Sequence, residues 1–181
     1  MKKEQITKEQ AIQRFAIFFD IFYFYHKRDI ESINFGKYLI GRVVLISFAC
    51  EIGIKSMVKY EGGEIPYTHK LDVLFGKLNP DTQKVLINES GYESDDFNTL
   101  IKENNSHFEE WRYLYNASNA NLKFLESLLV AIVKILLPEK YKSLQGPIVN
   151  SAHQSMIFGS NPTVLSRITG CGELKNIFPQ I

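Results

Sequence analysis

Several signals of catalytic and metal-binding proteins are missing from this sequence. It has two cysteines among 181 residues, no Cys-x-x-Cys pair, and no cysteine–histidine grouping at the spacing of a zinc site. It also lacks Gly-x-x-x-x-Gly-Lys-Ser/Thr, Gly-x-Ser-x-Gly and His-Glu-x-x-His, which would point to a phosphate-binding loop, a serine hydrolase or a zinc protease. We therefore expect no metal and no cofactor. Cys50 lies in an apolar helical stretch and is expected to be a buried free thiol.

An excess of one charge and a long apolar run are also lacking. The 21 Lys and Arg residues nearly balance the 20 Asp and Glu residues, whereas a dedicated nucleic-acid binder usually carries a clear basic excess. No uncharged apolar stretch reaches the ~18 residues of a membrane-spanning helix. The polar N-terminus has no signal-peptide layout. We expect a cytoplasmic protein that binds no membrane, and local basic patches remain compatible with this composition.

The sequence does contain sustained helical periodicity. Hydrophobic residues make up 45% of the chain, enough for one domain with a core, and they recur every three or four positions with no convincing alternating run. This pattern predicts an all-α fold, a helical bundle of four to six helices over residues 1–138. Residues 139–181 are interrupted by proline and glycine yet remain apolar, which predicts an irregular C-terminal tail packed on the same domain.

Local signals predict where the helices begin and end. Thr7 and Gln10 form a capping box for the first helix. The second helix is expected over 33–60 and should end at the Gly62-Gly63 pair. Asn79-Pro80 predicts a helix start, and Ser90-Gly91 the end of that helix. Pro138 is expected to end the apolar helix that begins near Leu122.

The first helix is unusually apolar. Besides its core-facing stripe it carries a second stripe, formed by Phe18, Ile21 and Tyr25. One bundle core does not normally need both stripes, so we expect a homodimer to which this helix contributes.

Two groups of side chains are candidate functional sites. The first is His107, Glu110 and Arg112, in which an acid, an imidazole and a guanidinium on one helix could bind phosphate or transfer protons. The alternative for this group is a capped helix start with a solvated charged face. The second is Glu51 with Lys55, four positions apart in the favourable order for an ion pair. His69 has no companion ligand nearby and is expected to make a local hydrogen bond.

The order of four segments resembles HEPN (higher eukaryotes and prokaryotes nucleotide-binding) domain proteins. The segments are Ala49-Cys50-Glu51-Ile52-Gly53-Ile54-Lys55, Gly62-Gly63, His69-Lys70-Leu71-Asp72-Val73-Leu74-Phe75 and Phe108-Glu109-Glu110-Trp111-Arg112-Tyr113. The resemblance implies a helical bundle, often dimeric, of the kind found in bacterial phage-defence and toxin–antitoxin systems. Many such domains are metal-independent RNases marked by an Arg, four to six residues and a His.

No arginine of this chain is followed by a histidine at that distance, and His107 precedes Arg112. The resemblance therefore implies a non-catalytic HEPN-like binding or regulatory protein, leaning away from an enzyme, with RNA, a nucleotide or a partner protein as its ligand. The alternative is a metal-independent RNase with an atypical site at a dimer cleft.

Overall fold

The computed structural model describes residues 6–31, 39–105 and 121–145, and these ranges form seven α-helices and no strand. The all-α prediction is confirmed for them. The helices are α1 (Lys8–Glu31), α2 (Leu39–Tyr60), α3 (Leu71–Phe75), α4 (Pro80–Ser90), α5 (Ser94–Glu103), α7 (Leu122–Leu136) and α8 (Pro138–Gln145). None of these helices is both long and apolar enough to cross a membrane.

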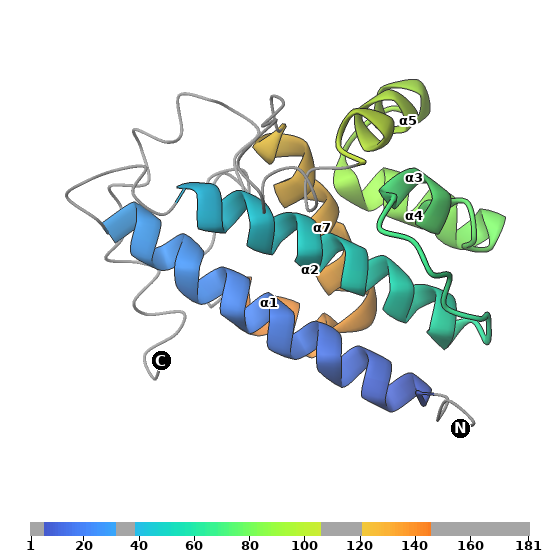
Figure 1. The fold of residues 1–181 in the computed structure, drawn as a ribbon, viewed down its shortest axis with the longest axis horizontal. Coiled ribbons are helices and arrows are strands. Elements are labelled where there is room, and N and C mark those ends of the chain that lie inside the picture. The colour runs from blue at the N-terminus through green and yellow to red at the C-terminus, as the bar shows by residue number, and fades with distance from the viewer. Residues whose placement is uncertain (1–5, 32–38, 106–120, 146–181) are drawn as a thin grey trace.

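The two long helices α1 and α2 run antiparallel and pack along their length, and α7 crosses behind α2 (Figure 1). The shorter helices α3, α4 and α5 lie together toward the C-terminal end of α2 (Figure 1). Contacts of α3 with α2 and α5, and of α4 with α7, join these helices to α2 and α7. The C-terminal half of α2, which carries Glu51 and Lys55, therefore lies where these two groups of helices meet.

One aromatic and aliphatic core holds all these helices together. Phe15, Phe19 and Phe22 of α1 are fully buried, as are Leu125 and Ile132 of α7. Aromatic rings continue the core toward α3 and α5, where the Phe97 ring centroid lies 5.0 Å from that of Phe75 and 5.4 Å from that of Phe124.

The crossing of α2 and α7 depends on a residue without a side chain. A Cβ atom on Gly53 would lie 2.7 Å from Cγ2 of Ile132 and 2.9 Å from Cε2 of Phe15. Real Cβ atoms do not approach other heavy atoms so closely. Glycine at this position therefore lets α1, α2 and α7 pack against one another at close range.

The predicted helix ends agree with the structure at several positions. Thr7 Oγ1 accepts a hydrogen bond from the Gln10 N–H at 3.2 Å, and Gln10 Oε1 accepts one from the Thr7 N–H at 2.9 Å, as a capping box requires. Gly62 has φ of 88° and ends α2, and Gly91 has φ of 76° and ends α4. At Asn79 the predicted start of α4 is confirmed, although its side chain makes no capping bond to the helix.

The number of helices and the start of the tail differ from the prediction. The described ranges hold seven helices instead of four to six. Pro138 ends α7 and also opens α8, because proline lacks only an N–H that the first turn of a helix does not need. The first residues of the predicted irregular tail are therefore helical. Residues 146–181 lie outside the described ranges.

Candidate functional site

Glu51 and Lys55 of the second predicted site form the expected ion pair, and a third residue contacts them. Lys55 Nζ lies 2.7 Å from Glu51 Oε1, within α2. Nδ1 of His69 lies 3.1 Å from Glu51 Oε1 and 3.0 Å from Oε2. We call these three residues the Glu51 cluster. One carboxylate thus holds both a lysine and a histidine.

Burial differs among the three side chains. The Glu51 side chain is 2% exposed, Lys55 is 16% exposed and His69 is 44% exposed. A carboxylate so deeply buried needs opposite charge or hydrogen-bond donors beside it, and the two nitrogen-bearing side chains supply them. Because the acid lies beneath and its partners lie toward solvent, a ligand approaching from outside meets the nitrogen groups first.

The chain turn after α2 brings His69 to Glu51. The N–H of Gly63 donates to the carbonyl of Val58 at 2.9 Å, which closes the end of α2. The following loop runs back along α2 to the start of α3. Sequence reasoning treated Glu51 and Lys55 as a pair and gave His69 a local hydrogen bond. The bond to Glu51, 18 residues away, was missed because helical periodicity carries no information across a turn.

The contact with Glu51 fixes how the His69 ring can act. Nδ1 faces the carboxylate and donates its hydrogen, so in the neutral ring the lone pair is on Nε2. A carboxylate beside one ring nitrogen orients the imidazole and leaves the other nitrogen to contact a ligand. The cluster can therefore bind an anion when the ring is protonated, or accept a proton when it is neutral.

The first predicted site lies outside the described ranges, but both ends of its segment are described. Asn105 Oδ1 accepts the N–H of Asp72 at 2.9 Å, at the start of α3. Asn104 Oδ1 accepts the N–H of Asn121 at 3.1 Å, just before α7. The described residues on either side of the segment, Asn105 and Asn121, are therefore both held at the end of α5. The grouping of His107, Glu110 and Arg112 stays a prediction.

A second acid–histidine contact is buried in the core. His26 of α1 is 2% exposed, and its Nδ1 lies 4.0 Å from Oε1 of Glu126 on α7. The ring also lies against Phe22, with centroids 5.5 Å apart. Helical periodicity alone did not indicate that Glu126 would be buried.

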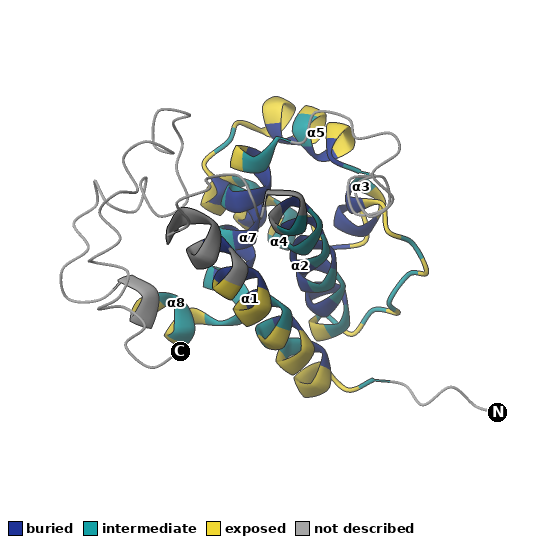
Figure 2. Ribbon diagram, turned by 60° about the vertical axis from the view of Figure 1, so that its left-hand side comes forward, coloured by how far each residue is buried: buried dark blue, intermediate teal, exposed yellow. Residues whose placement is uncertain are grey.

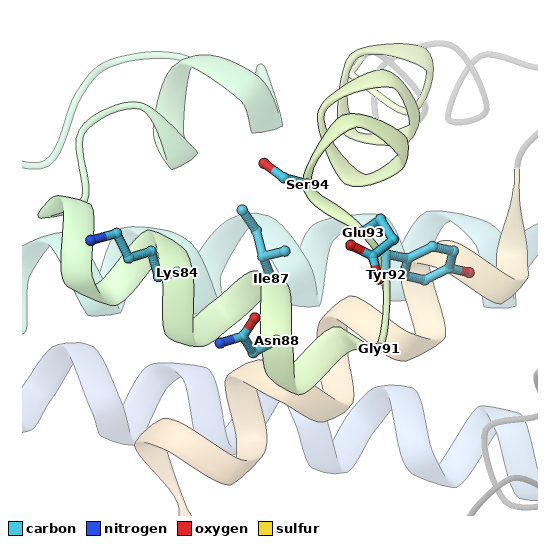
Figure 3. A pocket seen from close by; sticks show the side chains of 7 residues that line it. All are labelled: Lys84, Ile87, Asn88, Gly91, Tyr92, Glu93 and Ser94. Atoms are coloured by element: carbon cyan, nitrogen blue, oxygen red, sulfur yellow. The ribbon is translucent and has the colours of Figure 1, made fainter.

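An open pocket of about 580 Å³ lies between the end of α4 and the start of α5 (Figure 3). It is separate from the Glu51 cluster and is lined by Lys84, Ile87, Asn88, Gly91, Tyr92, Glu93 and Ser94. The Tyr92 ring is directed toward α7, where it contacts Phe124 at a centroid distance of 5.6 Å (Figure 3). Burial raises the pKa of Tyr92, and a hydrogen bond with Ser127 opposes that rise. The charged groups of this pocket, Lys84 and Glu93, have opposite sign.

In the part of the chain that the structure describes, no three His, Cys, Asp or Glu side chains are grouped as metal ligands. The Glu51 cluster brings a predicted pair together with a histidine and is the best-formed polar site of these ranges. Comparisons with protein-family models, curated proteins and solved structures gave no match to this chain.

Proposed function

We propose that this chain is a non-catalytic, HEPN-like binding or regulatory protein that binds the phosphate groups of RNA or of a nucleotide. The Glu51 cluster is the observation that supports this proposal. It lies on two of the segments that carry the resemblance, 49–55 and 69–75. The all-α fold is compatible with this proposal.

The arrangement of charge in the cluster favours an anionic ligand. Glu51 is covered by its two partners, so its negative charge is turned away from solvent. His69 presents its ring at the surface, and the exposed Lys70 follows it in the chain. Protonated imidazole and ammonium groups make charge-assisted hydrogen bonds to phosphate oxygens, which are stronger than bonds between neutral groups. His107, Glu110 and Arg112 are proposed to add to this surface.

Binding is tested with the full chain, a fluorescently labelled single-stranded RNA and a labelled nucleotide, by fluorescence polarisation. Losing a charge-assisted hydrogen bond costs ~1.5–3 kcal/mol, so His69→Ala should weaken binding by about 10- to 100-fold. Lys84→Gln removes a charge from the exposed surface of α4 and serves as the matched control. It should change the dissociation constant by less than about twofold. Wild-type protein that binds neither probe would contradict the proposal, and so would equal losses in the two variants.

The second candidate function is a metal-independent RNase with an atypical site at a dimer cleft. The contact between Glu51 and His69 is the observation in its favour, because a carboxylate-held imidazole is suited to take a proton from a ribose 2′-hydroxyl. Incubation of RNA with the protein in the presence of EDTA separates the two candidates. Intact RNA is expected from the first. Cleavage that His69→Ala abolishes would favour the second.

The setting that we propose is bacterial phage defence or a toxin–antitoxin pair, with the protein acting as a homodimer. A nucleotidyltransferase or restriction-type protein encoded beside this chain would support that setting. Co-purification of the full chain with such a neighbour is the corresponding experiment. Arg112→Ala should weaken RNA or nucleotide binding without unfolding the protein. If the variant unfolds, Arg112 does not belong to the ligand site.

A further inference from the structure

The pocket between α4 and α5 has walls that the fold holds in place before any ligand binds. Gly91 ends α4 with φ of 76°, a conformation that residues with a side chain rarely adopt, and lets the chain turn into α5. The Tyr92 ring packs on Phe124 and is hydrogen-bonded to Ser127. Ile87 packs against the hydrophobic core. Because these walls are preformed, a ligand orders few additional side chains when it binds.

The carboxylate of Glu93 lines this pocket and does not cap the helix that follows it. Glu93 is the N-cap residue of α5, but its side chain makes no capping hydrogen bond. Glutamate is not among the residue types preferred at an N-cap, which are Ser, Thr, Asp and Asn. In the described ranges, no lysine, arginine or histidine forms an ion pair with this carboxylate. A positively charged group of a ligand would therefore meet an exposed carboxylate that these ranges leave unpaired.

The surface around the pocket is acidic. Residues 80–103, which form α4, α5 and the turn between them, contain six acidic and two basic residues, a net charge of −4 in a chain whose overall charge is +1. Much of α5 is exposed, and it lies on the side of the molecule away from α1 (Figure 2). The basic residue that lines the pocket, Lys84, pairs with Asp81 at 3.5 Å and lies at the opposite end of the pocket from Glu93 (Figure 3). The surface as a whole therefore attracts cationic groups and repels RNA.

We propose that this pocket binds a basic segment of a partner protein, with a lysine or arginine of the segment at Glu93 and a neighbouring apolar side chain on Ile87. Charge complementarity selects a cationic partner. The open form of the pocket favours a peptide over a small molecule, because a small-molecule site typically encloses about 70–90% of its ligand. A peptide can pass along the open side while one of its side chains fills part of the 580 Å³. This inference goes beyond the proposed function, since neither His69 nor a phosphate ligand takes part in it.

The first experiment measures fluorescence polarisation of a labelled peptide, in which single leucines are separated by lysine and glycine, with the full chain. The peptide should bind, and added salt should weaken the binding. The same peptide with glutamate in place of lysine should not bind. A variant that combines Glu93→Gln, Asp95→Asn and Asp96→Asn should bind more than about tenfold more weakly, because it removes three charges at the pocket. Glu103→Gln is the matched control, an exposed acid at the other end of α5, and should change the dissociation constant by less than about twofold.

The second experiment separates the pocket from the acidic surface around it. Ser94 of α5 lines the pocket across from Ile87 of α4 (Figure 3). Ser94→Phe keeps every charge and fills the pocket with a ring, so it should weaken peptide binding by more than about tenfold. Thermal melting shows whether the variant is folded, and Asn88→Phe, from the α4 side of the pocket, takes its place if it is not.

Three results would overturn the proposal. The first is a wild-type chain that does not bind the basic peptide, including one that binds spermine instead, since the ligand would then be a small polyamine. The second is binding that a folded pocket-filling variant leaves unchanged, because the peptide would then lie elsewhere on the acidic surface. The third is equal weakening by Glu103→Gln and by the triple variant. His69→Ala should not change peptide binding, so a failure of the proposed RNA or nucleotide site is distinguishable from a failure of this one.

Discussion

His69 Nδ1 lies 3.0 Å from a carboxylate oxygen of Glu51, although the two residues are 18 positions apart and belong to different elements. The contact ties the loop before α3 to the buried side of α2. The Glu51 carboxylate therefore orients the ring of His69 and also fixes the position of the loop before α3. A substitution of Glu51 should therefore change both the orientation of the His69 ring and the packing of this loop.

The first prediction concerns the lysine of the Glu51 cluster. Lys55→Met removes one of two partners of a buried carboxylate, and should lower the free energy of unfolding by ~1–3 kcal/mol. Lys84→Met is the matched control, because the Lys84 and Asp81 side chains of that ion pair are 75% and 96% exposed. An exposed pair of this kind contributes little. Urea denaturation measures both variants, and equal midpoints would show that Glu51 is not held as described.

The second prediction concerns the close crossing at Gly53. Gly53→Ala adds a methyl group where Ile132 and Phe15 leave no room, and should lower stability by ~1–3 kcal/mol. For a chain of this size, each kcal/mol corresponds to a fall of ~2–4 °C in Tm. The control is Gly76→Ala, since Gly76 has φ of −64° and its Cβ would lie 3.4 Å from the nearest atom. Calorimetry should show a lower Tm than that of the wild type for Gly53→Ala but not for Gly76→Ala. The same Tm in both variants would contradict the described packing.

The third prediction concerns the Cys50 thiol. Cys50 is fully buried, its Sγ lies 3.4 Å from the carbonyl oxygen of Leu125, and burial raises its pKa well above the usual range. In a Cys171→Ser background, a thiol reagent should therefore modify Cys50 only as fast as the protein unfolds. Rapid modification of folded protein would contradict its burial.

The raised pKa of Cys50 also predicts how the stability of the protein depends on pH. The folded state holds the Cys50 proton more tightly than the unfolded state does. The associated stability is complete below the ordinary thiol pKa of ~8.5 and falls as pH rises above that value. Cys50→Ala should remove this part of the pH dependence. Urea midpoints measured across alkaline pH compare the two proteins.

Helix ends were predictable where a few neighbouring residues determine them. The reciprocal bonds of Thr7 and Gln10, and the positive φ of Gly62 and Gly91, depend only on local sequence. Pro138 shows the limit of such signals, since proline is compatible both with the end of α7 and with the start of α8.

The candidate site was predictable only in part. The spacing of Glu51 and Lys55 indicated a pair, but both the burial of that pair and its bond to His69 depend on the path of the loop. On α1, helical spacing found a second apolar face but could not show that Phe18 turns toward Phe48 while Ile17 faces solvent. Such distinctions depend on which neighbouring helix lies nearest.

Two adjacent asparagines also determine how the chain can vary. Asn104 binds the residue before α7 and Asn105 binds the start of α3, so the segment between them and Asn121 begins and ends at nearly one point. The end of α5 is thus joined to the starts of both α3 and α7 by two neighbouring side chains. Substitution of either asparagine would remove one of these two contacts. In evolutionary terms, we expect these two positions to vary less than the exposed positions of α5.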